Sequence, residues 1–541
     1  MTPTPPAPSG DAPPTRERVS LFDWLSLAAV ALVAAFLRLP GIEARGRFDA
    51  DQGHDMASLV AFTRDGVLPL LGPKTSVGEF HHGAFYYYLL APAAWISGGD
   101  PVAVTVFIAL LGIAAVALTW WLGRALGGPV AGLVAGMLLA VSPAAIEEST
   151  FIWNPNPIGC FAALALATAW KGHASGRARW WALAIGSAGV VAQLHVLGLV
   201  FLIAILGVAI FELRRDRSVS LGLLGGLAIV VLLFAPLAAH ELGSGFSETR
   251  AMVQYVGGAG GTTADPPRAL AFTMLRVVGW PLVGVVTDVP MLAAAMLAVT
   301  LGLTVLGLRA IRGEGATGLR WLVGILLFST IALALAAPSL QTVVAGLPND
   351  HYHAFLDPVV VLLLAVPAGV LFSRAARAWR ASRRPAMVAA VAALGVGIVA
   401  LELVALGRRP PKIDPDGGWL AAKVAGERVV AATNGGEVWI AGLPAFKLAD
   451  GIGYPIDYAG GNAGDIVDLT GYPEGSLPTV VACDRLFEAI IGLPCGGPAE
   501  DAFVGMLTRT YSGPGATPPQ LLDRFDASPR TSVSIYLAPA P

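Results

Sequence analysis

The fold class is decided by LFDWLSLAAVALVAAFLRLP, residues Leu21–Pro40, which runs directly into GIEARGRFDADQGHDM, residues Gly41–Met56. An α-helix rises 1.5 Å per residue, so about 20 apolar residues cross roughly 30 Å of hydrocarbon. Leu21–Pro40 has that length, whereas the acidic segment after it is too polar to stay in the hydrocarbon. The start of the chain therefore predicts a membrane helix followed by a segment at the membrane surface.

The composition of the whole chain agrees with a membrane protein. Of its 541 residues, 55% are hydrophobic and 13% are charged, and the mean hydropathy is +0.67. Soluble domains carry roughly 25% charged residues, so a soluble enzyme and a disordered chain are both excluded. The net charge of -2 also excludes a nucleic-acid binder that works through a basic surface.

About eleven apolar runs are candidate membrane helices, although the fourth and fifth are short, and they predict an all-α polytopic membrane protein. Joining the fifth and sixth runs into one helix would change the parity of the count. The runs are Leu21–Pro40, Val102–Leu122, Pro129–Ile146, Pro157–Trp170, Trp181–Gln193, Val196–Leu213, Leu221–Leu237, Val289–Ala310, Leu319–Ala337, Phe355–Phe372 and Pro385–Leu406.

The basic residues predict the orientation. They concentrate in the N-terminal tail, at Arg16 and Arg18, and in short loops such as the one with Arg214 and Arg215, as in cytoplasmic segments. We therefore expect a multi-pass plasma-membrane protein with a cytoplasmic N-terminus. Residues 1–20 are Pro-rich and polar and are expected to form a disordered tail, and residues 41–100 are expected to form a long first outer loop within a membrane domain of residues 21–406.

Residues 410–541 are predicted to form a small α/β domain on the outer face, where an odd number of helices places the C-terminus. Cys483 and Cys495 fall in this oxidising compartment, so we expect a disulfide, the alternative being two unrelated thiols. Cys160 lies in a membrane helix and is expected to be a packing residue. The β-like runs are Arg428–Ala432, Glu437–Ala441, Thr479–Ala482 and Ser532–Leu537.

Three aspartates lie within seven residues of the first outer loop, at Asp49, Asp51 and Asp55. The residues from 51 to 65 have a helical pattern, and Asp51 is expected to cap this helix at the membrane surface. Asp51 and Asp55 would then share one face and repel each other. A metal ion, the counter-cation of a lipid phosphate or an acceptor hydroxyl would make the arrangement useful. The alternative is an N-cap followed by a solvated helix face.

The same loop continues as LLGPKTSVGEFHHGAFYYYLLAP, residues 70–92, with Glu79, His81 and His82 ahead of an aromatic run that includes Tyr87. The aromatic run suits the headgroup level of a membrane. The two histidines could bind an anion when protonated or a metal ion when neutral, and the alternative is an ordinary polar loop.

Two further outer segments carry polar side chains. EESTFIWNPNP, residues 147–157, holds Asn154 and Asn156 in a rigid turn that could present amides to a ligand or simply start a helix. PNDHYHAFLDP, residues 348–358, holds His351 and His353, which could neutralise a phosphate or anchor the chain at the interface. Ionisable residues thus cluster at the headgroup level on one side, whereas proton and ion carriers place charges at mid-membrane.

The order of LRLPGI (residues 37–42), DADQGHD (residues 49–55), the segment of residues 70–92 and WNPNP (residues 153–157) resembles the GT-C fold. This fold belongs to membrane glycosyltransferases that use lipid-linked sugars, which include protein mannosyltransferases, lipid A aminoarabinose transferases and the RgtA/B/C/D-like branch. The likeness covers roughly residues 20–405. Asp51 matches the acidic first position of the family's first-loop motif, and Gln52 stands where the family has Glu.

The resemblance implies an enzyme that moves a sugar from a polyprenyl-phosphate donor to a lipid, glycan or protein acceptor outside the cytoplasm. Inverting transfer needs a base for the acceptor hydroxyl and cations for the departing phosphate. Metal dependence stays open, because carboxylates near histidines would tolerate a divalent ion. A transporter or lipid flippase, or a lipid-glycan polymerase or ligase, are the alternatives. We expect Asp51 to be the general base, with Asp49 as the runner-up and Asp55 as the residue that orients Asp51. The residues expected to bind the phosphate are His81, His82, His351 and His353. Those expected to contact the substrate are Glu79, Tyr87, Asn154 and Asn156.

Overall fold

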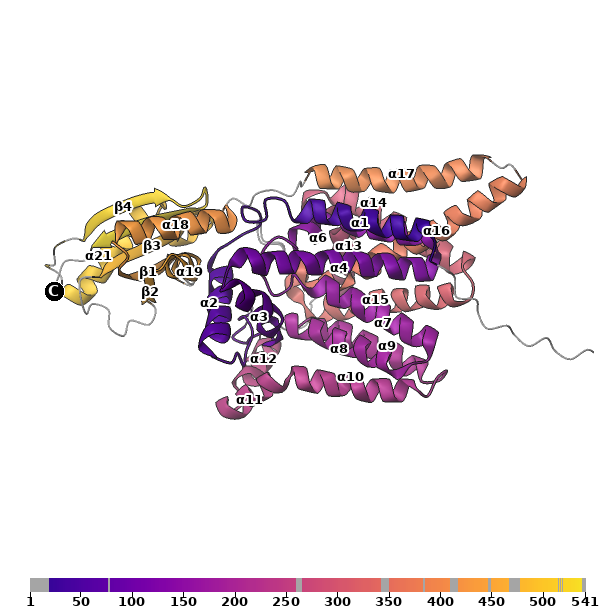
Figure 1. Cartoon of the computed structure of the whole chain (residues 1–541), viewed down its shortest axis with the longest axis horizontal. Coiled ribbons are helices and arrows are strands. Elements are labelled where there is room, and N and C mark those ends of the chain that lie inside the picture. The colour runs from indigo at the N-terminus through magenta and orange to yellow at the C-terminus, as the bar shows by residue number, and fades with distance from the viewer. Residues whose placement is uncertain are drawn as a thin grey trace, which may run out of the picture.

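The computed structural model of the chain has two parts, a bundle of long helices and a smaller part built on a β-sheet (Figure 1). Of the predicted tail, only Val19 and Ser20 are among the described residues, and the rest of it lies outside them. The structure describes residues 19–75, 78–258, 265–341, 350–382, 385–408, 417–445, 449–466, 477–513, 515, 517 and 519–537.

The apolar runs of the sequence form the helices of the bundle. Helix α1 (Leu21–Arg38) corresponds to the first run, and the Ser20 hydroxyl caps it by accepting a hydrogen bond from the backbone N–H of Asp23. The other runs form α4 (Pro101–Gly127), α5 (Pro129–Val141) with α6 (Pro143–Glu147), α7 (Ile158–Ser175), α8 (Ala178–Leu194), α9 (Gly198–Glu212), α10 (Val219–Leu233), α14 (Pro290–Ala310), α15 (Glu314–Ala336), α16 (Asp357–Ser382) and α17 (Pro385–Arg408).

Several of these helices are long and apolar enough to cross a membrane. Among the described residues there are 5 such helical segments by length and composition, and α10 with α11 (Ala235–Ser244), bent by 48°, could add another. Helices α5 and α9 are apolar but shorter. The predicted polytopic helical fold is confirmed, whereas the count of eleven spans stays a prediction. The segments are Leu21–Arg38, Pro101–Gly127, Pro290–Ala310, Glu314–Ala336 and Asp350–Arg377.

Residues 240–288, which lie between two apolar runs of the sequence, are not a simple loop. It contains α12 (Ser247–Gly257), α13 (Pro266–Val283) and the short helix η1 (Val286–Asp288). Helix α13 packs into the bundle, where its Arg276 is buried and its Nε lies 2.8 Å from Oδ1 of Asp350. The sequence analysis missed this helix because Arg276 and neighbouring prolines lower its hydropathy.

Residues 41–100, called the first outer loop after the sequence prediction, contain two helices between the bundle and the sheet domain, α2 (Ala50–Asp65) and α3 (Phe85–Ser97) (Figure 1). Arg38 at the end of α1 is fully buried and donates hydrogen bonds to the carbonyl oxygens of Leu139 and Ala140. These bonds fix the point at which the chain leaves the bundle and enters the loop. The short helices η2 (Pro338–Gln341) and η3 (Asp350–Leu356) precede α16 in the chain.

The C-terminal part is a five-stranded sheet between two layers of helices. Strand β1 is parallel to β2 and β3, whereas β5 is antiparallel to β3 and β4, and Ile440, Val480 and Ile535 stand side by side in the register. The order across the sheet is β2-β1-β3-β5-β4. The elements are α18 (Gly418–Ala432), β1 (Glu437–Leu443), α19 (Asp450–Tyr458), β2 (Asn462–Asp465), β3 (Pro478–Asp484), η5 (Arg485–Phe487), α20 (Glu488–Ile491), α21 (Pro498–Ser512), β4 (Gln520–Asp526) and β5 (Thr531–Leu537).

Three of the four predicted strands exist, as β1, β3 and β5, whereas the prediction of a strand at Arg428–Ala432 is wrong. Arg428–Ala432 forms the end of α18, whose buried positions Ala422, Ala425, Gly426 and Val429 recur at helical spacing. Strands β2 and β4 were not predicted.

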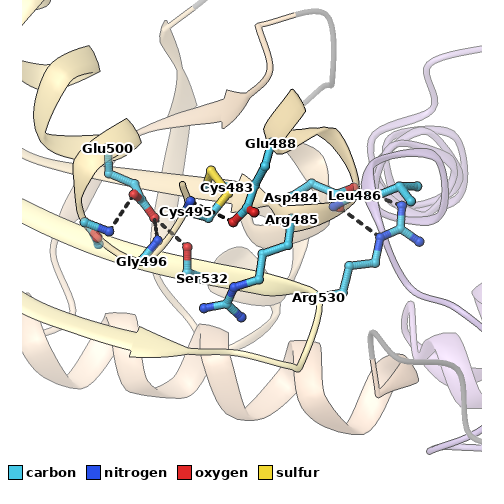
Figure 2. Close-up of a disulfide and its surroundings, with 12 residues drawn as sticks. Cys483, Asp484, Arg485, Leu486, Glu488, Cys495, Gly496, Glu500, Arg530 and Ser532 are labelled. Carbon is cyan, nitrogen blue, oxygen red and sulfur yellow. Dashed lines mark hydrogen bonds and ion pairs between the residues drawn. A yellow bond between two sulfur atoms is a disulfide. The ribbon is translucent and has the colours of Figure 1, made fainter. Parts of the chain in front are cut away.

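The two faces of the sheet are covered by different helices. Helices α18 and α19 pack on the face that carries Ile440 and Val480, and α21 packs on the face that carries Val481 and Cys483. Cys483 and Cys495 form the expected disulfide, which joins β3 to the segment before α21 (Figure 2). Cys160 is buried in α7 as a free thiol, in keeping with a packing role.

Candidate active site

A cavity of about 1030 Å³, called here the large cavity, lies where the first outer loop, α12, α15 and η3 come together. Ala336 and Ala337, at the C-terminal end of the apolar helix α15, belong to its wall. The large cavity therefore adjoins the end of a helix long enough to cross the membrane. The predicted site residues on its wall are Asp51, Asp55, Glu79, His81, His82, Tyr87, Asn154 and His351.

Helix α2 places its aspartates in three different environments, and its cap is Asp49 rather than the predicted Asp51. The Asp49 carboxylate accepts a hydrogen bond from the backbone N–H of Asp51 at 3.2 Å, and the side chain of Gln52 accepts one from the backbone N–H of Asp49. Asp49 thereby serves as the N-cap and lines a separate cavity of about 70 Å³ against the C-terminal domain. Asp51, in the first turn, is exposed on the wall of the large cavity.

Asp55 lies one turn further along α2 and is buried. Tyr86 and Tyr87 of α3 donate hydrogen bonds from their hydroxyls to its two oxygens, at 2.8 and 2.9 Å. Burial disfavours the charged form more than these bonds favour it, and it raises the pKa of Asp55 to about 7. Tyr87 is thus part of the support of Asp55 as well as part of the cavity wall.

His54 is a cavity residue that the sequence analysis did not single out. Its Nδ1 lies 2.9 Å from Oδ2 of Asp450 in the C-terminal domain, and its side chain is 48% exposed on the cavity wall. The hydrogen bond to Asp450 is the main cause that raises the pKa of His54. The spacing of three residues from Asp51 could have revealed His54 once the helix was placed correctly, but nothing in the sequence indicates its partner.

The loop after α2 brings a basic group to the wall of the large cavity. Lys74 and Glu79 form an ion pair, and both lie on the cavity wall. The His81 backbone N–H donates to a carboxylate oxygen of Glu248 in α12 at 2.7 Å, and its Nδ1 lies 3.1 Å from the same oxygen. Glu79 is therefore paired with a lysine, and Glu248 orients His81. Lys74 is a second cavity residue that the sequence analysis passed over.

His82 and His195 form a buried, uncharged part of the wall. Their ring centroids are 4.8 Å apart, and both side chains line the large cavity. Burial lowers the pKa of His82 to about 3 and lowers that of His195 well below its usual value. His82 is therefore a neutral hydrogen-bonding group in the cavity wall, and its contact with phosphate stays a prediction. His82 Nδ1 is buried and has no hydrogen-bond partner within the described part of the chain.

The two histidines of η3 are separated by the fold. His351 faces the large cavity, where its ring packs against Trp153 with centroids 4.3 Å apart. His353 points away from the cavity and is fully buried, with Nε2 3.2 Å from Oδ1 of Asp350. Asn349, part of the same predicted patch, lies outside the described residues. Of these two histidines, His351 is the one placed to contact a ligand in the large cavity.

The two asparagines of the WNPNP segment hold the loop together. Asn154 donates its amide N–H to the Leu194 carbonyl oxygen, and Asn156 donates to that of Phe151, each at 2.6 Å. Asn154 still lines the large cavity, whereas Asn156 does not. Gln52 of α2 donates to the Ile152 carbonyl oxygen at 2.9 Å, so the same loop also supports the helix that carries Asp51.

Within the described ranges, no group of three or more His, Cys, Asp or Glu side chains is arranged to hold a metal ion. The question of a divalent ion, left open by the sequence, therefore gains no candidate ligand set.

Comparison with known proteins identifies the fold. Residues 81–240, less than a third of the chain, match the family model described as dolichyl-phosphate-mannose-protein mannosyltransferase. No curated protein matches the sequence. Two solved structures are similar over most of the chain, although identity is only 13% in each case.

The first of these structures is ArnT from Cupriavidus metallidurans bound to undecaprenyl phosphate, with a TM-score of 0.55 over 95% of this chain and 98% of that one. The second is the oligosaccharyltransferase of Archaeoglobus fulgidus in its apo form, with a TM-score of 0.55 over 87% of this chain and 70% of that one. These similarities confirm the GT-C fold that the sequence indicates for this multi-pass membrane protein.

Proposed function

We propose that this protein is a membrane glycosyltransferase that moves a sugar from a polyprenyl-phosphate donor to an acceptor hydroxyl outside the cytoplasm. The observation that carries the proposal is the large cavity, whose wall includes both the exposed carboxylate of Asp51 and the end of an apolar helix. Its volume of about 1030 Å³ is at the upper end of ligand pockets, which leaves room for a sugar phosphate and an acceptor together.

The fold supports the donor class. The family model that matches residues 81–240 is described by a dolichyl-phosphate-mannose donor, and the ArnT structure holds undecaprenyl phosphate. A donor of this kind has a long apolar chain and an anionic head, so its head belongs where helix ends meet water. The contact of the large cavity with the end of α15 satisfies that requirement.

Asp51 is the proposed general base. It is the exposed member of the three aspartates, whereas Asp49 caps the helix and Asp55 has both oxygens engaged by tyrosine hydroxyls. The acceptor O–H bond breaks as its proton passes to Asp51, and the oxygen bonds to the anomeric carbon. The bond from that carbon to the phosphate oxygen breaks, and its electron pair stays on the phosphate. This displacement inverts the anomeric centre.

The leaving phosphate needs positive charge or hydrogen-bond donors. Lys74 and His81 lie on the cavity wall in the loop after α2, and each is held by a carboxylate, Glu79 or Glu248. We assign the phosphate end of the large cavity to this loop, and the acceptor end to α2 with Asp51. The buried aromatic and imidazole groups, among them His82 and His351, are assigned to the sugar between the two ends.

The proposed topology places the N-terminus in the cytoplasm and the large cavity on the outer face of the plasma membrane. The bias of arginine and lysine toward the N-terminal tail and alternate short loops supports this orientation. Acceptors and donor sugars would then meet outside the cytoplasm.

The experiment is complementation of a deletion strain, with surface glycans and glycolipids measured by mass spectrometry. The wild-type gene should restore one sugar modification, and Asp51→Asn should not, at equal protein levels in the membrane. Asp65→Asn is the matched control, because Asp65 is an exposed aspartate of the same helix outside the large cavity. Restoration by Asp51→Asn would remove Asp51 from the role of base.

A second measurement separates transfer from transport. Purified wild-type protein in lipid vesicles should consume a labelled polyprenyl-phosphate sugar only when membranes of the deletion strain are present as acceptor. Movement of the labelled lipid across the bilayer without formation of a new glycosidic bond would favour a flippase and overturn the proposal.

A further inference from the structure

The C-terminal domain is docked on the loop that carries the proposed base. Phe48, just ahead of α2, packs against Trp419 of α18 with ring centroids 4.8 Å apart. The Leu420 backbone N–H donates to the Glu43 carbonyl oxygen at 2.9 Å, and the Tyr454 hydroxyl donates to the Gly99 carbonyl oxygen. The domain therefore contacts the beginning and the end of the first outer loop, with α2 between these contacts (Figure 1).

Helices α2 and α19 approach each other through glycines. A Cβ atom on Gly53 would lie 2.0 Å from the Asp450 carbonyl oxygen, and one on Gly451 would lie 2.9 Å from the Asp49 carbonyl carbon. No side chain fits at either point, so the two backbones are in direct contact. One contact lies at Asp49, ahead of Asp51, and the other at Gly53, next to His54, so the position of α19 fixes the position of both cavity residues.

Two polar contacts reinforce this docking, one at the N-cap of α2 and one at the start of its second turn. Asp450 bonds to Nδ1 of His54, which leaves Nε2 for the cavity. Arg530 reaches the Asp49 carboxylate at 3.7 Å. Arg530 is itself held by Asp484 at 2.9 Å, as Figure 2 shows. The C-terminal domain thus holds both the N-cap of α2 and a side chain three residues beyond Asp51.

We propose that the C-terminal domain completes the active site, and that Asp450 is a positioning residue that acts through His54. Asp450 fixes the ring of His54 so that Nε2 holds the hydroxyl-bearing acceptor against Asp51. A carboxylate on one ring nitrogen sets both the orientation and the protonation of a histidine whose other nitrogen faces a substrate. This inference rests on the proposed function, because it assigns the acceptor end of the same cavity.

The ionisable groups around His54 determine its pKa, and this pKa in turn affects how kcat depends on pH. Loss of Asp450 removes the main group that raises the pKa of His54, so the imidazolium would give up its proton at lower pH. These groups come from two helices: Asp450 of α19, and Asp51 and Asp55 of α2.

The test compares purified variants in lipid vesicles with the labelled polyprenyl-phosphate sugar that the wild type consumes and membranes of the deletion strain as acceptor. Asp450→Asn and His54→Gln should each lower kcat at least tenfold and leave KM for the labelled lipid unchanged. The double variant should be no slower than the slower single variant, because both changes break one contact. Glu427→Gln, at an exposed site of α18, is the charge-matched control and should match the wild type.

Two further readouts separate positioning from a purely structural role. In Asp450→Asn the alkaline limb of the kcat profile should move to lower pH, and Asp450→Glu should recover part of the rate. An Asp450→Asn enzyme with the wild-type rate and pH profile, or effects that multiply in the double variant, would overturn the inference while transfer by the wild type stands. A wild type without transfer would instead overturn the proposed function, and this inference with it.

Discussion

Replacement of Asp55 by Asn should remove a pH-dependent loss of stability from the protein. Burial raises the pKa of this carboxyl from 3.8 to about 7. The difference of about three pKa units corresponds to about 4 kcal/mol, at 1.36 kcal/mol per unit. The burial of the side chain, 2% exposed, means that solvent does little to screen this cost.

The sign follows from the two protonation states. Below pH 4 the carboxyl carries its proton in the folded and the unfolded chain, so it adds no pH dependence. Between about pH 4 and 7 the unfolded chain releases the proton and the folded protein keeps it, so stability falls as the pH rises. Above about pH 7 both states are ionised and the slope ends. Asparagine cannot ionise, so the variant lacks this slope.

The assay is thermal unfolding in nanodiscs at pH 5, 6, 7 and 8, followed by tryptophan fluorescence. The variant should gain apparent melting temperature over the wild type as the pH rises, with most of the gain complete by pH 8. Asp65→Asn, an exposed carboxylate on the same helix, should follow the wild type at every pH. A difference between Asp55→Asn and wild type that is the same from pH 5 to pH 8 would refute the reasoning.

Two predictions concern the C-terminal domain. Gly53→Ala places a methyl group 2.0 Å from a backbone oxygen of α19, so it should cost about 1–3 kcal/mol and make the domain easier to release by limited proteolysis. Gly302→Ala in α14 is the control, because the new carbon would meet no atom of a neighbouring element within 4 Å, and it should leave the cleavage pattern unchanged. Equal cleavage patterns for the two variants would contradict the argument. Cys483→Ser opens a disulfide across 12 residues and should destabilise the domain by about 3 kcal/mol, measured as a lower melting temperature under non-reducing conditions. An unchanged melting temperature would show that the bond contributes little.

Hydropathy predicted the helices of the bundle well because most of them are apolar along their whole length. It failed at α13, where Arg276 interrupts the pattern although it is buried beside Asp350. The two residues are 74 positions apart, and the sequence alone does not show that their charges meet. A buried ion pair therefore hides a helix from an analysis based on hydropathy.

Local pattern was least reliable where two kinds of periodicity overlap. Arg428–Ala432 contains adjacent valines, which favour strands, yet it completes α18 because Ala425 and Val429 continue the buried stripe of that helix. The cap of α2 was placed two residues late for a similar reason, since Asp49 and Asp51 are equally good caps by residue type.

The candidate site was predictable in its parts but not in its assembly. The acidic motif, the loop with His81 and the WNPNP segment were each recognised, and the fold brings most of their polar side chains to one cavity. The pairing of His54 with Asp450 spans 396 residues, and it depends on the docking of a second domain. Such a contact leaves no local pattern for sequence analysis to find.

The glycine contact between α2 and α19 also constrains how the chain threads the bilayer. Two backbones in contact must lie on the same face of the membrane, so the chain between Asp65 and Gly417 crosses an even number of times. The ten segments predicted between them obey this rule. Joining α8 and α9 into one crossing would leave nine and put Gly53 and Gly451 on opposite sides of the lipid.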